Sequence, residues 1–402
     1  MMNRGHTCIF SMAVVFASAT VLAQDTCPSS SYLSLYAPAV PGFGGELIYE
    51  NMSIDGDTGY LCSTYFDMFQ EQSYYYLNIV DVSDPQTPHL IAQPELTAQP
   101  AAIRVVNDIA YIADFYGLRI IDLSQPLQPN QLALYPTSSF PMDLQIQGTK
   151  AYIARRDDGL EIVDISDPQL PTHLGELDLP GESRAVVIDD DFAYLVDEIA
   201  LRVVDITNPA NPTLAGSSMT SADAWDLSVG EGGIVYLADR ASGSSVMSSL
   251  QVYDTTNPNA PSPIASLSYG TFGSVRGVHV MGNQLFVVHG SSGLQSLDIS
   301  NPSSPQPNGE YDQAPFIHAM ASHDGLLYAT SSNVGLVIID PSVACGQCQV
   351  DLNADGVLDF FDVSLFISAF SNQLPQGDFT GDGVYDFFDV SSFINLYHAG
   401  CP

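Results

Sequence analysis

Leu77-Asn-Ile-Val-Asp81 is the stretch that decides the fold, because six further segments of the chain repeat its pattern. The other copies are Leu118-Arg-Ile-Ile-Asp122, Leu160-Glu-Ile-Val-Asp164, Leu201-Arg-Val-Val-Asp205, Leu250-Gln-Val-Tyr-Asp254, Leu294-Gln-Ser-Leu-Asp298 and Leu336-Val-Ile-Ile-Asp340. Their closing aspartates stand 41, 42, 41, 49, 44 and 42 residues apart. Such a fixed period is the signature of a repeat architecture.

Each unit also contains an earlier strand-like run that ends in an aromatic residue: Tyr60, Tyr111, Tyr152, Tyr194, Tyr236, Phe286 and Tyr328. Gly, Pro, Asn and Asp separate these runs, and no helical period of ten residues occurs among them. About four strands in 40–45 residues is typical of a propeller blade, whereas solenoids of similar period need helices. Seven units therefore predict an all-β, seven-bladed β-propeller.

The repeated aspartate is followed in most units by a turn such as Ser83-Asp84-Pro85 or Thr207-Asn208-Pro209. Asp side chains readily accept hydrogen bonds from the backbone of a following turn. Catalysis does not need seven copies of one residue. We therefore expect a structural role for the aspartate.

These repeats resemble the LVIVD-repeat family over residues 48–341, since Leu77 to Asp81 and Leu160 to Asp164 nearly spell its name. The resemblance implies a β-propeller that is secreted or displayed on a cell surface, and it implies no single activity.

The seventh unit ends at Asp340, which leaves no room for its outer strand. The stretch Tyr32-Leu-Ser-Leu-Tyr36 is similar to the outer-strand stretch Leu132-Ala-Leu-Tyr135 of another unit. We predict that residues 31–38 complete blade seven, because closing the ring removes an exposed sheet edge.

Composition limits the partners. The chain has 402 residues, with 10 Lys+Arg against 46 Asp+Glu and a formal charge of −36. An acidic surface repels phosphate backbones and anionic lipid, which argues against nucleic acid and membrane surfaces as partners. A hydrophobic content of 46% argues against a disordered chain.

The N-terminus predicts export. Arg4 precedes a short apolar run that ends in Val21-Leu22-Ala23, as in a signal peptide covering residues 1–23, and no later stretch is long enough to span a membrane. We expect a secreted or cell-surface protein. In such a compartment the cysteines favour the disulfides Cys348–Cys401 and Cys27–Cys345, with Cys62 a buried thiol, although spacing alone does not fix connectivity.

Five polar residues lie nine or ten positions before the aromatic residue of their units: Asp143, Arg184, Asp226, Arg276 and His318. If they face the central channel, its rim carries mixed charge and suits a polar ligand such as a sugar. Alternatively, they begin strands and bond to neighbouring turns. A second polar set, three positions after the aromatic, is expected to pair with loop amides: Asp114, Arg155, Asp197, Asp239 and His289.

No catalytic residue can be assigned. The chain has no Gly-x-Ser-x-Gly, no His-Glu-x-x-His and no P-loop. Carboxylate pairs arise by chance in a chain this acidic, and the histidines of the last two units fit structural roles as well as an acid/base site. We expect a binding protein more than an enzyme.

Two twelve-residue loops near the C-terminus predict two Ca²⁺ sites. Both place oxygen donors at positions 1, 3, 5, 9 and 12, glycine at position 6 and a backbone carbonyl at position 7, which matches calcium's preference for six to eight oxygens. The predicted ligands are Asp351, Asn353, Asp355, Val357, Asp359 and Asp362, and then Asp378, Thr380, Asp382, Val384, Asp386 and Asp389.

No helix can enter either loop, but one can leave each, over residues 363–370 and 390–397. A duplicated loop and helix ending in Gly400-Cys401 resembles a dockerin module, over residues 349–402. The resemblance implies attachment to a cohesin-like or other extracellular protein, often in polysaccharide degradation. At loop positions 10 and 11 many members carry small hydroxyl residues, but this chain carries Phe360-Phe361 and Phe387-Phe388. Exposed, these pairs form a docking patch; buried, they fill the module's core.

The predicted organisation is a signal peptide (1–23), an LVIVD-repeat propeller (24–344) and a dockerin-like calcium module (345–402). We expect the propeller to be a binding body that the module attaches to an extracellular assembly. The rival hypothesis is a dockerin-anchored enzyme, a hydrolase or lyase acting on carbohydrate. A purely structural surface component, which would have no pocket, is a third.

Overall fold

The computed structural model describes residues 32–36, 47–67, 71–221, 223–240, 248–269, 275–290, 293–311, 316–332, 334–342, 350, 352, 358, 360–374, 377, 379 and 384–399. By its internal contacts the chain divides into two compact units, one holding the strands and the other the two C-terminal helices. The predicted signal peptide and the residues Cys27, Cys345, Cys348 and Cys401 lie outside the described residues.

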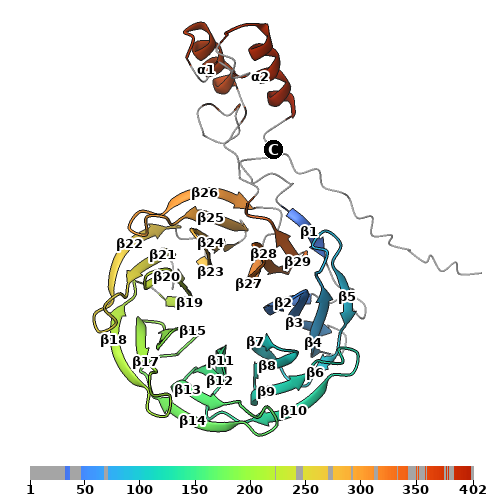
Figure 1. Cartoon of the computed structure of the whole chain (residues 1–402), viewed down its shortest axis with the longest axis vertical. Coiled ribbons are helices and arrows are strands. Elements are labelled where there is room, and N and C mark those ends of the chain that lie inside the picture. Colours follow the sequence, from blue (N-terminus) through green and yellow to red (C-terminus); the bar gives the residue numbers. More distant parts are fainter. Residues whose placement is uncertain are drawn as a thin grey trace, which may run out of the picture. The chain divides into compact units, whose positions relative to one another are not determined.

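The larger unit is a seven-bladed β-propeller, as the repeat predicts (Figure 1). Blade one contains β2 (Leu47–Asp55), β3 (Thr58–Asp67), β4 (Gln72–Asp81) and β5 (His89–Ala92), with β6 (Glu95–Leu96) also paired to β4. Blade two contains β7 (Pro100–Val106), β8 (Ile109–Asp114), β9 (Gly117–Asp122) and β10 (Asn130–Tyr135). Blade three contains β11 (Pro141–Gln147), β12 (Lys150–Arg155), β13 (Gly159–Asp164) and β14 (Thr172–Leu177).

The remaining blades follow the same antiparallel order. Blade four contains β15 (Ala185–Asp189), β16 (Phe192–Val196), β17 (Ala200–Asp205) and β18 (Thr213–Met219), and blade five contains β19 (Asp223–Gly230), β20 (Ile234–Arg240), β21 (Ser249–Asp254) and β22 (Ser262–Ser268). Blade six contains β23 (Val275–Met281), β24 (Gln284–His289), β25 (Leu294–Asp298) and β26 (Gln306–Tyr311). Blade seven contains β27 (Ile317–His323), β28 (Leu326–Ser331), β29 (Gly335–Ile339) and β1 (Tyr32–Tyr36).

Blade seven is closed by the N-terminal strand, as predicted. β1 pairs antiparallel with β29, and Tyr36 lies opposite Leu336. The outer strand of the last blade therefore comes from the other end of the propeller sequence, so that the first and last repeats share one sheet.

The repeated motif forms the third strand of each blade and supplies the core between blades. In β9, Leu118 and Ile120 pack toward blade three, while Ile121 packs toward blade one. Alternate residues of a strand point to opposite faces of its sheet, so one short aliphatic motif contributes to two interfaces. Cys62 is fully buried in β3, as expected.

The closing aspartates are structural, as predicted. In all seven copies the Oδ1 atom accepts the backbone amide of the residue two positions on, at 2.8–2.9 Å. Hydrogen bonds from the amide and hydroxyl of that residue hold the pKa of six of these carboxyls below its ordinary value: Asp81, Asp122, Asp164, Asp205, Asp254 and Asp298.

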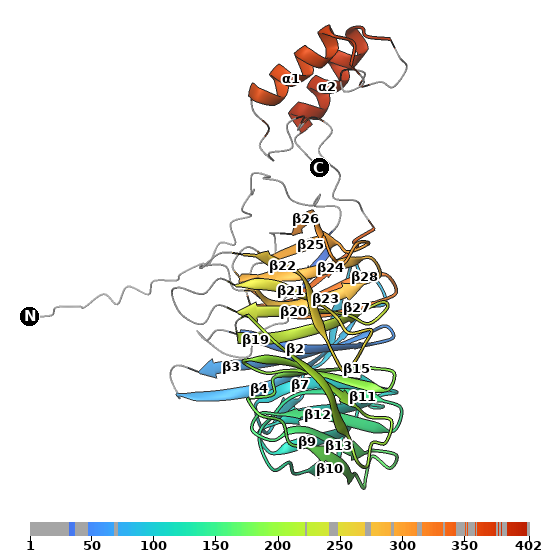
Figure 2. The ribbon, with the colours of Figure 1, turned by 90° about the vertical axis from the view of Figure 1, so that its left-hand side faces the viewer.

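Seen edge-on, the propeller is a disc whose strands run across its thickness (Figure 2). The β3–β4 hairpin projects beyond the neighbouring strands, because each of its strands has ten residues. The projection lies at the end of the disc where the innermost strands begin, since β3 ends and β4 begins there.

The smaller unit contains α1 (Phe360–Ser371) and α2 (Phe387–Ala399). Both predicted helices are present, and each begins three residues earlier than expected. Phe366 and Phe393 stack between them with ring centroids 4.0 Å apart. Neither of the described helices is long and apolar enough to cross a membrane.

Candidate binding channel and the C-terminal helix pair

The innermost strand of every blade faces a central channel. These strands are β2, β7, β11, β15, β19, β23 and β27, and they encircle the centre of the ring in Figure 1. Their side chains line a cavity of about 930 Å³. All seven strands begin at the same end of the disc, which we call the mouth, because every blade repeats the same antiparallel order.

The structure brings together all five residues that the sequence placed at the rim. Asp143, Arg184, Asp226, Arg276 and His318 line the channel, and each comes from a different blade. The shared position relative to the aromatic residue of the next strand was therefore a sound guide to the inner face of the ring.

The two aspartates connect neighbouring blades. The Oδ2 atom of Asp143 in blade three accepts the amide of Val186 in blade four at 3.0 Å. The Oδ2 atom of Asp226 in blade five accepts the amide of Val278 in blade six at the same distance. The Oδ1 atom of each also accepts the amide of the next residue along the chain, so both carboxyls contribute to holding the ring together.

Burial changes the acidity of these carboxyls. Desolvation raises the pKa of Asp226 to about 7, and the nearby charge of Asp143 adds to the rise. Desolvation also raises the pKa of Asp143, opposed by the Arg104 guanidinium, whose Nη2 atom lies 3.5 Å from Oδ1 of Asp143. Asp226 is therefore partly protonated near neutral pH.

The histidines of the channel are uncharged at neutral pH. Desolvation and the charge of Arg104 lower the pKa of His279 to about 4, and its Nε2 atom lies 2.9 Å from the Ser322 hydroxyl. The pKa of His318 is also lowered, by desolvation and by Arg276. Neither ring adds positive charge there.

Trp225 contacts two arginines at the mouth of the channel. The guanidinium carbons of Arg184 and Arg240 lie 4.8 and 4.9 Å from the centroid of the Trp225 ring. The indole N–H donates to Asp223 at 3.1 Å, and Asp223 also pairs with Arg184. Cation–π contacts of this kind restrain the guanidiniums.

Sequence reasoning missed several channel residues, including Arg104, Arg156 and Trp225. Arg104 lies within its strand rather than at its start, so the alignment on the aromatic residue did not select it. Trp225 could have been found, because it is the one tryptophan of the chain.

The second predicted polar set mostly serves the loops, as expected. Asp114 accepts the amide of Tyr116 at 2.8 Å and pairs with Arg119 at 2.6 Å. Asp197 likewise accepts two loop amides and pairs with Arg202 at 2.9 Å. These buried ion pairs fasten the second strand of a blade to its third.

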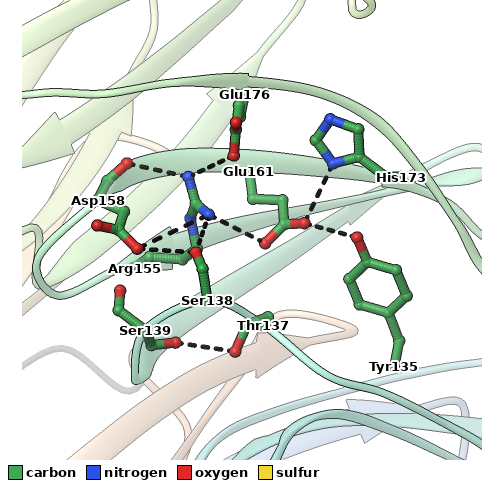
Figure 3. Close-up of polar contacts among 9 residues, drawn as sticks. All are labelled: Tyr135, Thr137, Ser138, Ser139, Arg155, Asp158, Glu161, His173 and Glu176. Atoms are coloured by element: carbon green, nitrogen blue, oxygen red, sulfur yellow. Dashed lines mark hydrogen bonds and ion pairs between the residues drawn. The ribbon is translucent and has the colours of Figure 1, made fainter.

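Arg155 differs from these aspartates, because its guanidinium contacts several carboxylates as well as the loop carbonyl of Asp158, to which it donates at 3.1 Å (Figure 3). Its guanidinium pairs with Glu176 at 3.0 Å and with Glu161 at 3.5 Å. Glu161 in turn accepts the hydroxyl of Tyr135 at 2.6 Å. Arg155 is 2% exposed, and because Tyr135 belongs to β10, this buried network connects blade two to blade three.

In the C-terminal unit, two of the predicted metal ligands occupy equivalent places. Asp362 and Asp389 are each the third residue of their helix, and both are fully buried. Asp362 accepts the amide of Leu352 and Asp389 accepts that of Asp386, both at 2.9 Å.

The structure describes only two of the other predicted calcium ligands. Asp386 lies just before α2, and Val384 is 55% exposed. The rest lie outside the described residues: Asp351, Asn353, Asp355, Val357, Asp359, Asp378, Thr380 and Asp382. Among the residues that the structure describes, no three acidic, histidine or cysteine side chains form a group that could hold a metal.

The paired phenylalanines are exposed rather than buried. Phe360, Phe361, Phe387 and Phe388 retain 75, 64, 75 and 66% of their accessible surface. Of the two alternatives that the sequence left open, burial in the core of the module is therefore excluded within this unit.

Five stretches of the chain match the LVIVD repeat: residues 74–93, 101–137, 141–178, 180–220 and 272–313. The chain thus carries LVIVD repeats in blades one to four and six, while blades five and seven complete the ring without a match. No curated protein matches the sequence of the chain.

Solved structures share the fold at low identity. The computationally designed Ika8 protein has a TM-score of 0.52 and 10% identity, over 79% of this chain and 100% of that one. A chain of the Mitotic Checkpoint Complex has a TM-score of 0.57 and 8% identity, over 76% and 98%. A functionally unknown protein from Desulfotomaculum acetoxidans DSM 771 has a TM-score of 0.54 and 15% identity, over 73% and 89%. At these identities the likeness shows the fold alone.

Proposed function

We propose that this LVIVD-repeat propeller is a secreted binding protein whose channel holds a polar ligand, and whose C-terminal unit is a calcium-binding, dockerin-like attachment module. The observation that carries the proposal is the convergence of charged side chains from five blades in one channel of about 930 Å³. Concave sites with a few convergent polar groups are the usual ligand sites of proteins.

The converging side chains are held in place by contacts between neighbouring blades, which preorganises them for a ligand. The bridges between blades explain Asp143 and Asp226, whose oxygens accept amides of neighbouring inner strands. Ion pairs with Glu182, at 2.8 and 3.7 Å, hold Arg156 and Arg184 at the same channel, which Arg276 also lines. Arginine is a common ligand-binding residue because its guanidinium presents a fork of donors.

The C-terminal unit suits calcium by its charge balance. Residues 345–402 contain eight aspartates and no lysine or arginine. Two of those aspartates, Asp362 and Asp389, are fully buried. Burying a carboxylate is costly unless a cation or strong donors compensate, and a divalent ion bound in each of the two loops would supply that charge. The ligands would be the twelve residues that the loop pattern predicts.

The attachment surface of the module would include the two phenylalanine pairs. Exposed apolar side chains in such number mark interaction sites, and aromatic residues are frequent anchors at protein interfaces. We assign the partner to the cohesin-like or other extracellular proteins that the dockerin resemblance implies, and we place the protein outside the cell.

A second candidate is an enzyme that acts on carbohydrate, as a hydrolase or lyase. One observation favours it: the pKa of Asp226 is about 7, which suits a general acid. The binding function is preferred because both oxygens of Asp226 already accept backbone amides.

A glycan array probed with the full chain tests the proposal. We expect some saccharides to be retained, and Trp225→Ala to weaken their binding about tenfold or more. Leu170→Ala, at an exposed site in the loop between β13 and β14, is the matched control and should bind normally. The proposal fails if no glycan is retained, or if both variants bind alike. If the full chain releases reducing ends from a saccharide and Asp226→Asn abolishes that release, the enzyme hypothesis would be favoured instead.

A further inference from the structure

We propose that the ligand of the channel is an acidic saccharide, whose carboxylate groups bind the arginines of the mouth. The inference rests on the proposed function, because it specifies the ligand of the same channel. Three observations support it: the charge of the lining, the protonation of its titratable side chains and the aromatic side chains around the mouth.

The lining reverses the charge of the chain. Its arginines are Arg104, Arg156, Arg184 and Arg276, and its acidic residues are Asp143 and Asp226. Two carboxylates beside the lining offset part of this charge, because Glu182 pairs with Arg156 at 2.8 Å and Asp223 pairs with Arg184. With Arg240, five arginines still face four acidic residues around the channel. The whole chain has 46 acidic against 10 basic residues. A concave site with an excess of positive charge concentrates the field between low-dielectric walls, so an anion is attracted to this place and repelled from most of the remaining surface.

The titratable groups leave this excess in place at neutral pH. His279 and His318 have lowered pKa values and stay neutral, while Asp226 loses part of its negative charge because its pKa is raised. Arg104 itself lies in the lining, with its Nη2 atom 3.5 Å from Oδ1 of Asp143.

Arg240 extends the cationic wall. It lies over Trp225 beside Arg184, and in the described part of the chain no carboxylate lies within ion-pair distance of it. Guanidinium groups held in place by an aromatic ring are suited to two-pronged hydrogen bonding with a carboxylate.

Aromatic side chains around the mouth favour a sugar over a simple organic acid. Phe115 and Tyr116 are 67 and 55% exposed in the loop between β8 and β9, and the Phe115 ring lies 6.1 Å from that of Phe140 in the channel lining. Phe316, 47% exposed, precedes β27 at the same end. Flat apolar rings are suitable surfaces for the faces of sugar rings, as they are for other flat groups.

Titration of trigalacturonate into the full chain tests the inference, with its methyl ester as the uncharged ligand of the same shape. The chain contains one tryptophan, so its fluorescence reports on the mouth directly. We expect the acid to change the fluorescence and to bind at least about tenfold more tightly than the ester. Added salt should weaken binding of the acid, because screening reduces charge attraction.

Arg276→Gln should weaken binding of trigalacturonate about tenfold or more and leave binding of the ester unchanged. Lys150→Gln removes the same charge at the start of β12, at the end of the disc opposite the mouth, and is the matched control. Equal binding of acid and ester would overturn the inference and leave the proposed function standing. Tighter binding of triglutamate than of trigalacturonate would overturn the saccharide class. Failure of every saccharide to bind would overturn both proposals.

Discussion

At the scale of single residues, side chains of one blade accept backbone amides of the innermost strand of the next blade. These amides have no neighbouring strand to bond to. The innermost strand is an edge of its sheet, so amides on its channel side lack a ladder partner. Asp143 and Asp226 accept two such amides from the next blade. Ser53 does the same for Val105 between blades one and two, at 3.0 Å.

The raised pKa of Asp226 makes the stability of the propeller depend on pH. The folded state binds a proton more readily than the unfolded state, whose carboxyl titrates near 3.8, so stability is greatest below that value and falls as pH rises through about 7. The fall stays below about 4 kcal/mol, the limit for a shift of that size.

Urea unfolding at pH 5, 6, 7 and 8 measures the effect. We expect Asp226→Asn to flatten the fall with pH, and to lose about 1 kcal/mol at pH 5 because one amide loses its acceptor. Glu231→Gln, at an exposed position, should behave as the natural chain does. An unchanged pH dependence in Asp226→Asn would contradict this assignment.

The sequence identified the two bridging aspartates but not the residues that they contact. Aligned positions identified Asp143 and Asp226 as inner residues, because every blade uses the same place. Their partners, Val186 and Val278, could not be found from local pattern, since each contact joins two blades some 43 and 52 residues apart.

At the scale of elements, the aliphatic motif and its turn determine most of the fold. Strands, turns and the number of blades follow from local pattern, and all are observed. The length of the β3–β4 hairpin and the short strand β6 did not follow, because blade one departs there from the other repeats.

Removal of β1 should weaken the ring at one place. Deleting residues 24–45 removes the pairing of β1 with β29, which matches four residue pairs. At about 1 kcal/mol for each backbone hydrogen bond, the loss is about 4 kcal/mol, or a melting temperature lower by about 5 °C in a protein of this size.

Differential scanning calorimetry measures the change. Deletion of residues 24–31 alone spares β1 and is the matched control. Equal melting temperatures for the two truncations would show that β1 contributes little to closure.

At the scale of the whole molecule, the chain joins a propeller to a unit of different chemistry. The sequence predicted both helices of that unit and the equivalent places of Asp362 and Asp389, because the loop is duplicated. It left the phenylalanine pairs undecided, since burial depends on how the two helices pack rather than on local pattern.

Isothermal titration with calcium should show about two sites per chain. Asp351→Ala combined with Asp378→Ala should abolish both, because each change removes the first ligand of a loop. Asp84→Ala with Asp167→Ala changes the charge equally in two propeller turns and should keep both sites. Calcium should also stabilise the unit against unfolding, as metal binding and folding are coupled in small modules. Unchanged stoichiometry in the first double variant would refute the calcium assignment.

The sheet that joins the two ends of the propeller also sets the order in which the protein can be made. Tyr36 leaves the ribosome early and waits for Leu336, 300 positions later, before its strand finds a neighbour. Until then the ring of blades is not closed, and the growing polypeptide exposes two unpaired strand edges. Any translation product cut short before Gly335 lacks β29 and never seals, so premature termination yields chains prone to aggregation rather than smaller working proteins.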